Sequence, residues 1–227
     1  MLILLQTNVA QEPITTAVTI ERMNLWTMAT YGGPIVIILA ALLAFAIYMF
    51  IERVITLKQA LEEDKSFMNR IRDYIYDGKI EAAQKLCKDT NNPIARMVEK
   101  GISRLGRPMS DVLVAIENVG NLEIANLEKG LVIMASISGG APMLGFLGTV
   151  TGMVTTFYNM SLNNTGTIQL ADLSQGMYQA MVTTIAGLIV GIIAYFGYNY
   201  LVSRVDSVVR RLEARTMEFL DMLNEPA

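Results

Sequence analysis

The chain has 227 residues, of which 52% are hydrophobic and only 17% charged, and its mean hydropathy is +0.40. Soluble domains carry about a quarter charged residues, so this composition is typical of a membrane protein. The net charge of −3 gives no basic surface for nucleic acid, and the single cysteine, Cys87, cannot form a disulfide within the chain. The sequence has no histidine, no nucleophile paired with a base, no P-loop and no cysteine-paired metal site. We therefore expect neither an enzyme nor a bound metal or other cofactor.

In chain order, the first predicted element is a translocated N-terminal segment over 1–31. Within it, IERMNLWTM (20–28) predicts an amphipathic helix at the membrane interface. The uncharged run GGPIVIILAALLAFAIYMFI follows at 32–51 and has the length of about 20 apolar residues that crosses a bilayer. Trp26 and Tyr48 lie near its two ends, where interfacial aromatic residues are common. Residues 32–51 are therefore predicted as the first transmembrane helix.

The segment 52–130 is charged and predicts a small helical domain in the cytoplasm. Its apolar residues recur at helical spacing, and turn signals at Asp77-Gly78 and Asn91-Asn92-Pro93 divide it into helices. These predicted helices cover residues 53–76, 79–90 and about 94–105. Glu52 and Arg53, directly after the first span, either bond a neighbouring helix or anchor the membrane edge by snorkelling.

A longer helix is expected from Ser110, a residue type that caps helix N-termini. No proline interrupts the pattern before Pro142, so this helix is predicted to run without a break into the second transmembrane helix at 131–160. Pro142 either kinks that span or is accommodated by neighbouring helices.

A short polar connection at 161–172 leads to the third transmembrane helix, predicted at 173–203. The apolar stripe continues through 204–227, which predicts a cytoplasmic extension of the same helix. Helices of about fifty residues are on the order of 70 Å long, which exceeds the thickness of a bilayer. The predicted fold is therefore an all-α membrane protein with three transmembrane helices, two of them extended far into the cytoplasm, and a small helical cytoplasmic bundle.

The basic residues predict the orientation of these helices. Residues 52–130 hold thirteen of the eighteen lysines and arginines, and 204–227 hold four. Because basic loops stay in the cytoplasm, we expect the N-terminus and the 161–172 connection on the periplasmic side and the C-terminus in the cytoplasm.

Small residues recur at intervals of three and four in the second and third spans, so they share one face of each helix. The second span contributes Gly145, Gly148, Thr149, Gly152 and Thr156, and the third contributes Gly176, Ala180, Thr183, Thr184, Gly187, Gly191 and Ala194. One interpretation is close helix packing, since small faces let membrane helices approach. The other is a narrow polar path lined by the threonine hydroxyls.

Two stretches resemble the signature of the MotA/TolQ/ExbB proton-channel family. They are APMLGFLGTVTGMVTTF (141–157), preceded by LEKGLVIMASIS, and MYQAMVTTIAGLIVGIIAYFGYN (177–199). The resemblance covers most of residues 30–215. Three spans with an outside N-terminus are similar to the ExbB and TolQ branches and not to the four-span MotA branch. The cysteine and proline of the middle segment favour ExbB.

The resemblance implies an energiser subunit of the bacterial inner membrane, in contact with lipid. Five copies would surround the single membrane helices of two ExbD-type partners, and proton flow would drive motion that is passed to a TonB-type protein. The alternatives are a TolQ-like, gliding or secretion motor, and a non-conducting membrane scaffold. A proton path needs a titratable group, yet Asp172 is the only charge between Lys129 and Arg204. The family supplies this group as an aspartate of the partner helix.

Carried over residue by residue, the resemblance places Thr149 and Thr184 at the pore, facing that aspartate. Thr183, Thr156 and Gln179 are expected beside them on the pathway. Gln179 stands where ExbB members usually have glutamate, and because an amide cannot titrate, we expect it to hydrogen-bond or to position water. The residues expected to serve helix packing are Gly145, Gly148, Gly152, Gly187, Gly191 and Pro142.

Overall fold

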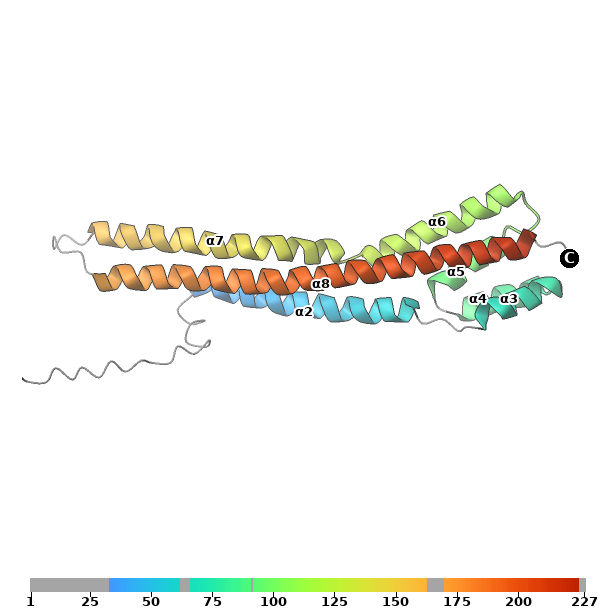
Figure 1. Cartoon of the computed structure of the whole chain (residues 1–227), viewed down its shortest axis with the longest axis horizontal. Coiled ribbons are helices and arrows are strands. Elements are labelled where there is room, and N and C mark those ends of the chain that lie inside the picture. The colour runs from blue at the N-terminus through green and yellow to red at the C-terminus, as the bar shows by residue number, and fades with distance from the viewer. Residues whose placement is uncertain (1–32, 62–65, 91, 163–169, 225–227) are drawn as a thin grey trace, which may run out of the picture.

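Three long helices form the body of the molecule (Figure 1). The computed structural model describes residues 33–61, 66–90, 92–162 and 170–224, and these ranges contain helices and turns but no strand. The long helices are α2 (Gly33–Leu61), α7 (Leu131–Leu162) and α8 (Leu170–Asn224). The predicted interfacial helix at 20–28 lies outside the described residues.

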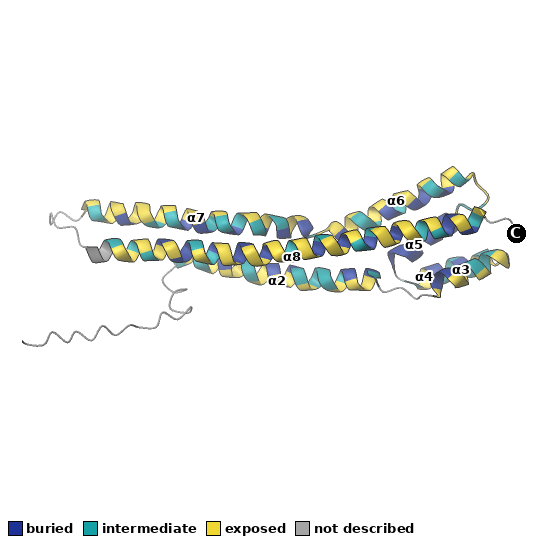
Figure 2. Cartoon of the chain, in the orientation of Figure 1, coloured by how far each residue is buried: buried dark blue, intermediate teal, exposed yellow. Residues whose placement is uncertain are grey.

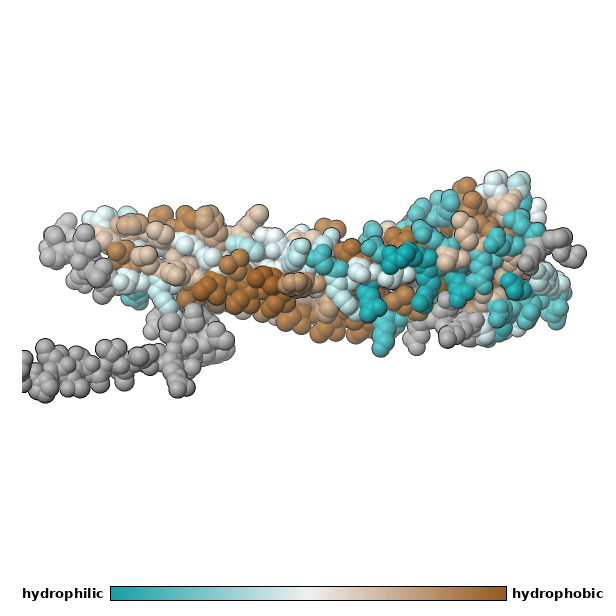
Figure 3. Space-filling model, in the orientation of Figure 1, coloured by the Kyte–Doolittle hydropathy of each residue, from teal (hydrophilic) through white to brown (hydrophobic). Residues whose placement is uncertain are grey.

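One half of the molecule has the surface of a membrane protein. Among the described residues, three helical stretches are long and apolar enough to cross a membrane: Gly33–Leu61, Met109–Leu162 and Leu173–Asn224. Large apolar side chains cover their outer surface, and Ile37, Phe146 and Phe196 are 71%, 67% and 68% exposed. Hydrophobic surface gathers over this half and hydrophilic surface over the other (Figure 3). The exposed apolar surface fits contact with lipid or with other membrane helices.

The first long helix continues past the span predicted at 32–51 and ends at Leu61. The predicted helix over 53–76 was therefore wrong as a single element. Leu57, one of its apolar positions, is 2% exposed and belongs to α2. The guanidinium of Arg211 on α8 donates to the carbonyl of Leu61 over 2.7 Å, which satisfies a terminal carbonyl of α2. The next helix, α3 (Phe67–Tyr76), stops at the predicted Asp77-Gly78 turn, where Gly78 has φ +73°.

The other half is a helical bundle of α3, α4 (Ile80–Asp89), α5 (Pro93–Ile102), α6 (Met109–Glu128) and the C-terminal part of α8 (Figure 1). The centre of this bundle is α5, in which seven of ten residues are buried. The Asn92 side chain accepts a 2.7 Å hydrogen bond from the Ala95 amide and caps α5. The Arg96 guanidinium donates to both carboxylate oxygens of Glu123 at 2.7 and 2.6 Å, which fixes α5 on α6.

The helix leading into the second span is interrupted. The sequence predicted an unbroken helix from Ser110, but α6 begins at Met109 and ends at Glu128, and α7 starts at Leu131. Between them Gly130 has φ +88°, a conformation that glycine adopts without steric cost. A Cβ at Gly130 would lie 2.8 Å from the Met49 Cε and 3.1 Å from the Arg53 Nε, so α2 fills the space beside the break. By contrast, α8 runs unbroken for 55 residues, as the sequence predicted.

Candidate functional site

Backbones of α7 and α8 come into direct contact along the small faces of both helices. A Cβ placed on Gly187 would lie 2.7 Å from the Ala141 carbonyl oxygen and 2.8 Å from the Gly145 Cα. One placed on Gly145 would lie 2.9 Å from the Thr183 carbonyl oxygen. Real Cβ contacts are not this short, so the approach requires glycine at both positions. Such close approach is how membrane helices gain packing energy without a hydrophobic driving force.

The same contact extends towards both ends of the pair. Gly148 lies against the Thr183 side chain, and Gly152 lies against Ala180. The ring of Pro142 packs on Gly191, whose Cβ would meet the proline Cγ at 2.5 Å. The chain stays helical across Pro142. All six residues predicted for helix packing therefore lie at the α7–α8 contact, and packing remains our interpretation of their role.

Threonine hydroxyls meet at the middle of this contact. The hydroxyls of Thr149 on α7 and Thr184 on α8 hydrogen-bond each other, and both residues are partly exposed. Both hydroxyl oxygens also lie within hydrogen-bond distance of the Gly145 carbonyl oxygen, at 3.3 Å and 3.2 Å, and the hydroxyl that accepts within the pair is the one free to donate there. Thr183 is 2% exposed and donates to the Ala180 carbonyl at 2.7 Å, with a longer contact of 3.5 Å to the Gly145 carbonyl. One carbonyl therefore joins the hydroxyls of two helices.

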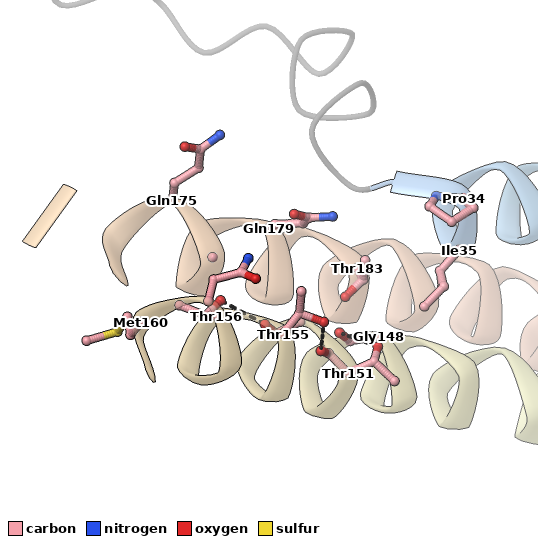
Figure 4. A pocket seen from close by; sticks show the side chains of 13 residues that line it. Pro34, Ile35, Gly148, Thr151, Thr155, Thr156, Met160, Gln175, Gln179 and Thr183 are labelled. Atoms are coloured by element: carbon pink, nitrogen blue, oxygen red, sulfur yellow. Dashed lines mark hydrogen bonds between the residues drawn. The ribbon is translucent and has the colours of Figure 1, made fainter. Parts of the chain in front are cut away.

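A polar pocket of about 540 Å³ opens between α7, α8 and the start of α2 (Figure 4). It lies near the end of the bundle where α7 ends and α8 begins, the end that the sequence predicts to be periplasmic. None of the described residues that line it carries a charge. The lining consists of Pro34, Ile35, Gly148, Thr151, Gly152, Thr155, Thr156, Asn159, Met160, Gln175, Gly176, Gln179 and Thr183.

The structure separates the five predicted pathway residues into two groups. Thr156, Thr183 and Gln179 line the pocket, whereas Thr149 and Thr184 do not. Gln179 is exposed beside α2, and a Cβ on Gly33 would lie 2.9 Å from its Nε2. Thr156 is 9% exposed and donates to the Gly152 carbonyl at 2.8 Å. Gln179 therefore lies in the pocket and not at the Thr149–Thr184 pair, and Thr183 adjoins both because its hydroxyl also reaches the Gly145 carbonyl.

Sequence reasoning missed several polar residues of the pocket. Thr151, Thr155 and Asn159 follow one another at intervals of four on α7, and Gln175 precedes Gln179 by four on α8. That spacing places each set on one helix face and was the signal available in the sequence. The Thr151 and Thr155 hydroxyls donate to their own helix, to the Leu147 carbonyl and the Thr151 carbonyl, each at 2.9 Å.

The chemistry open to this site is hydrogen bonding and not acid–base exchange by its own groups. No Asp, Glu, Lys or Arg occurs in 131–162 or 173–203. Across the described ranges, no group of three or more His, Cys, Asp or Glu side chains is arranged to hold a metal ion. A hydroxyl both donates and accepts, so the Thr149–Thr184 pair can bond a carboxylate as well as a carboxylic acid brought beside it.

The fold and the site define the class of protein: a multi-pass helical membrane protein with paired glycine and threonine faces on two of its spans. The profile of the MotA/TolQ/ExbB proton channel family matches residues 89–214, more than half of the chain, and the chain belongs to this family. The family is one of proton channels and not of enzymes.

Three relatives illustrate the range of the family around this chain. The biopolymer transport protein ExbB homolog of Methanothermobacter thermautotrophicus is 28% identical over 183 residues, covering 80% of this chain and 64% of that protein. The biopolymer transport protein ExbB of Aquifex aeolicus is 38% identical over 79 residues, covering 35% of this chain and 52% of that protein. The Tol-Pal system protein TolQ of Haemophilus influenzae is 30% identical over 107 residues, covering 47% of this chain and 46% of that protein. This chain thus spans less than two thirds of the length of each.

Proposed function

We propose that this chain is the channel subunit of an energiser driven by the proton-motive force. Several copies, five by the family resemblance, form a ring in the bacterial inner membrane around the helices of two ExbD-type partners. Proton flow through the ring moves the partners and powers TonB-dependent transport across the outer membrane. The N-terminus lies in the periplasm, and the α3–α6 bundle and the C-terminus lie in the cytoplasm, as the distribution of basic residues favours.

The observation that carries this proposal is the Thr149–Thr184 hydroxyl pair, which lies between two predicted transmembrane helices that contain no charged residue. An isolated hydroxyl pair in hydrocarbon contributes little to stability, since interhelical hydrogen bonds in membranes average about 0.6 kcal/mol. Both residues are partly exposed, so the pair can reach a group outside the chain. We infer that this group is a carboxyl on the partner helix. The hydroxyls donate to it when it is ionised and accept from it when it is protonated.

The polar pocket beside α2 suits a supporting role in this proposal. Its amides and hydroxyls can hold water at the periplasmic end of the span without binding a proton themselves. Protons would enter there as hydrated species and would pass to the partner carboxyl at the Thr149–Thr184 pair. Gln179 then positions water, in agreement with its inability to titrate.

Proton flux into liposomes that contain this chain and an ExbD-type partner tests the proposal. Replacing Thr149 and Thr184 by valine removes both hydroxyls and preserves shape, and we expect partner-dependent flux to fall by about tenfold or more. The matched control replaces Thr56 by valine and Ser136 by alanine, because these hydroxyls bond only their own helices and line neither the pair nor the pocket. Unchanged flux and energised uptake in the Thr149/Thr184 variant would refute the proposed role of the pair.

The test also separates the alternatives. A Tol-type, gliding or secretion motor predicts the same loss of flux without a loss of TonB-dependent uptake, and the similarity to TolQ keeps this branch in view. A non-conducting scaffold predicts no partner-dependent flux in the unaltered chain. Loss of flux on replacing the pocket residues Thr151 and Thr155 by valine, with unchanged flux in the Thr149/Thr184 variant, would move the pathway to the pocket beside α2.

A further inference from the structure

The cytoplasmic part of α8 carries an exposed face with a row of acidic residues. Exposed positions recur along α8 (Figure 2). Residues three and four apart share one side of a helix, so the exposed residues at 206, 210, 213, 217 and 221 form one row, with the exposed Arg211 and Ala214 beside it. We call this row the α8 ridge; it consists of Asp206, Arg210, Glu213, Met217 and Asp221. Three of the five are carboxylates, and Met217 between them is 63% exposed. Methionine is enriched at protein interfaces, where its flexible side chain adapts to the partner.

On the same half of the molecule, α5 and α6 enclose an open groove of about 470 Å³. We call it the α5–α6 groove; it is lined by Lys100, Arg104, Asp111, Val114, Ala115, Asn118, Val119 and Leu122. Its lining carries two cations and one carboxylate, so its balance of charge is opposite to that of the α8 ridge. Val114 and Leu122 are 54% and 66% exposed, a large apolar exposure outside the membrane-spanning half.

The α8 ridge and the α5–α6 groove lie at the same level along the bundle. The Phe219 ring reaches Gly101 at the end of α5, where a Cβ would lie 2.6 Å from its Cε1 and 2.9 Å from the Ile116 Cδ1 of α6. Copies embedded in one bilayer are related by rotation about the membrane normal, which preserves the level of every residue. Surfaces that pair between such copies must therefore share a level, as these two do.

The two surfaces also match in length. Glu213 and Asp221 are eight residues apart on α8, and Val114 and Leu122 are eight residues apart on α6, which corresponds to roughly 12 Å in both cases. The two surfaces differ from each other, so their contact is heterologous and repeats from copy to copy until a ring closes.

We propose that the α8 ridge of one copy docks into the α5–α6 groove of the next copy of this chain. Met217 lies over the apolar floor made by Val114 and Leu122, and Glu213 and Asp221 face Lys100 and Arg104. The inference rests on the proposed ring and names the cytoplasmic surfaces that close it. Charge complementarity at such a contact selects the register and the partner more than it adds affinity.

Charge reversal on either surface tests the contact. One variant carries Lys100→Glu with Arg104→Glu, a second carries Glu213→Lys with Asp221→Lys, and a third carries all four changes. Helix α4 offers matched controls, Lys85→Glu with Lys88→Glu and Glu81→Lys with Asp89→Lys, because these four residues are exposed and lie on neither surface. The readouts are the native mass of the detergent-solubilised chain at one concentration and its helicity by circular dichroism.

We expect each two-residue reversal on the docking surfaces to lower the assembled fraction by about tenfold at unchanged helicity, because attraction becomes repulsion. The four-residue variant is expected to restore the assembled fraction, and both α4 controls to assemble like the unaltered chain. Rings that survive the two-residue reversals, or a four-residue variant that fails to assemble, would overturn the ridge–groove contact. Those outcomes leave the proposed function standing, whereas an unaltered chain that is monomeric and gives no partner-dependent flux would refute both.

Discussion

The closest approach of α7 and α8 gives a prediction whose size follows from the structure. Alanine at Gly187 would place a Cβ 2.7 Å from the Ala141 carbonyl oxygen and 2.8 Å from the Gly145 Cα, both on backbone that cannot rotate away. Carbon atoms attract best at about 3.5–4.0 Å, so the helices must separate by roughly 0.7 Å or more at this point. A gap of this size forfeits about a quarter to a half of the local dispersion energy, and such overpacking costs about 1–3 kcal/mol.

The matched control for this prediction is alanine at Gly139, on the same pair of helices. A Cβ there has no neighbour within 4 Å. Both substitutions gain a similar helix propensity of about 1 kcal/mol, so the difference between them isolates the steric term. Denaturant unfolding of the detergent-solubilised chain, followed by circular dichroism, should show Gly187→Ala less stable than Gly139→Ala by about 1–3 kcal/mol. Equal stability of the two variants would show that the helices do not meet as closely as described.

Three further predictions concern residues outside the predicted transmembrane helices. Burial raises the pKa of the Cys87 thiol from 9.0 to about 12. Alkylation of the folded chain should therefore stay slow at pH 9–10, where the unfolded chain reacts. Because the unfolded thiol ionises first, the folded chain should lose stability as pH rises from 9 towards 12. Arg96→Lys keeps the charge but loses the two-point contact with Glu123, and denaturant unfolding should show a loss of about 1 kcal/mol. Gly130→Ala should destabilise more than Gly106→Ala in thermal melts, because both have positive φ but only the Gly130 position is crowded by neighbouring side chains.

The helical content of the fold was predictable from the sequence, and two helix boundaries were not. Continuous hydrophobicity and the absence of proline indicated the long helices, and α8 is unbroken as expected. The same rule failed at Gly130, because a lone glycine is tolerated in many helices and one sequence reveals neither its positive φ nor its closeness to Met49 and Arg53 of another helix. The rule also failed at 53–76, which contains the end of α2 and all of α3. The apolar residues of both helices keep one helical spacing in the sequence, so the spacing did not reveal the boundary between them.

The candidate site was predictable as a set of residues but not as an arrangement. Spacing alone placed Thr149 and Thr184 on the small faces of their helices, and the structure brings their hydroxyls together. The spacing did not indicate that Gln179 lies beside α2, because the side of a helix that faces a third helix is decided by tertiary packing. The resemblance to the family implied one pathway for all five residues. Within one copy, Thr156, Thr183 and Gln179 line the pocket, and Thr149 and Thr184 lie outside it.

The native mass of the purified complex tests the central claim most directly. The chain would be expressed alone and beside a single-span ExbD-type protein, solubilised in detergent and measured in both forms. The account predicts an oligomer of this chain that gains about two copies of the partner, since the Thr149–Thr184 pair has no carboxyl of its own to serve. An oligomer that excludes the partner would contradict the account, because its membrane path would then contain no group that can carry a proton.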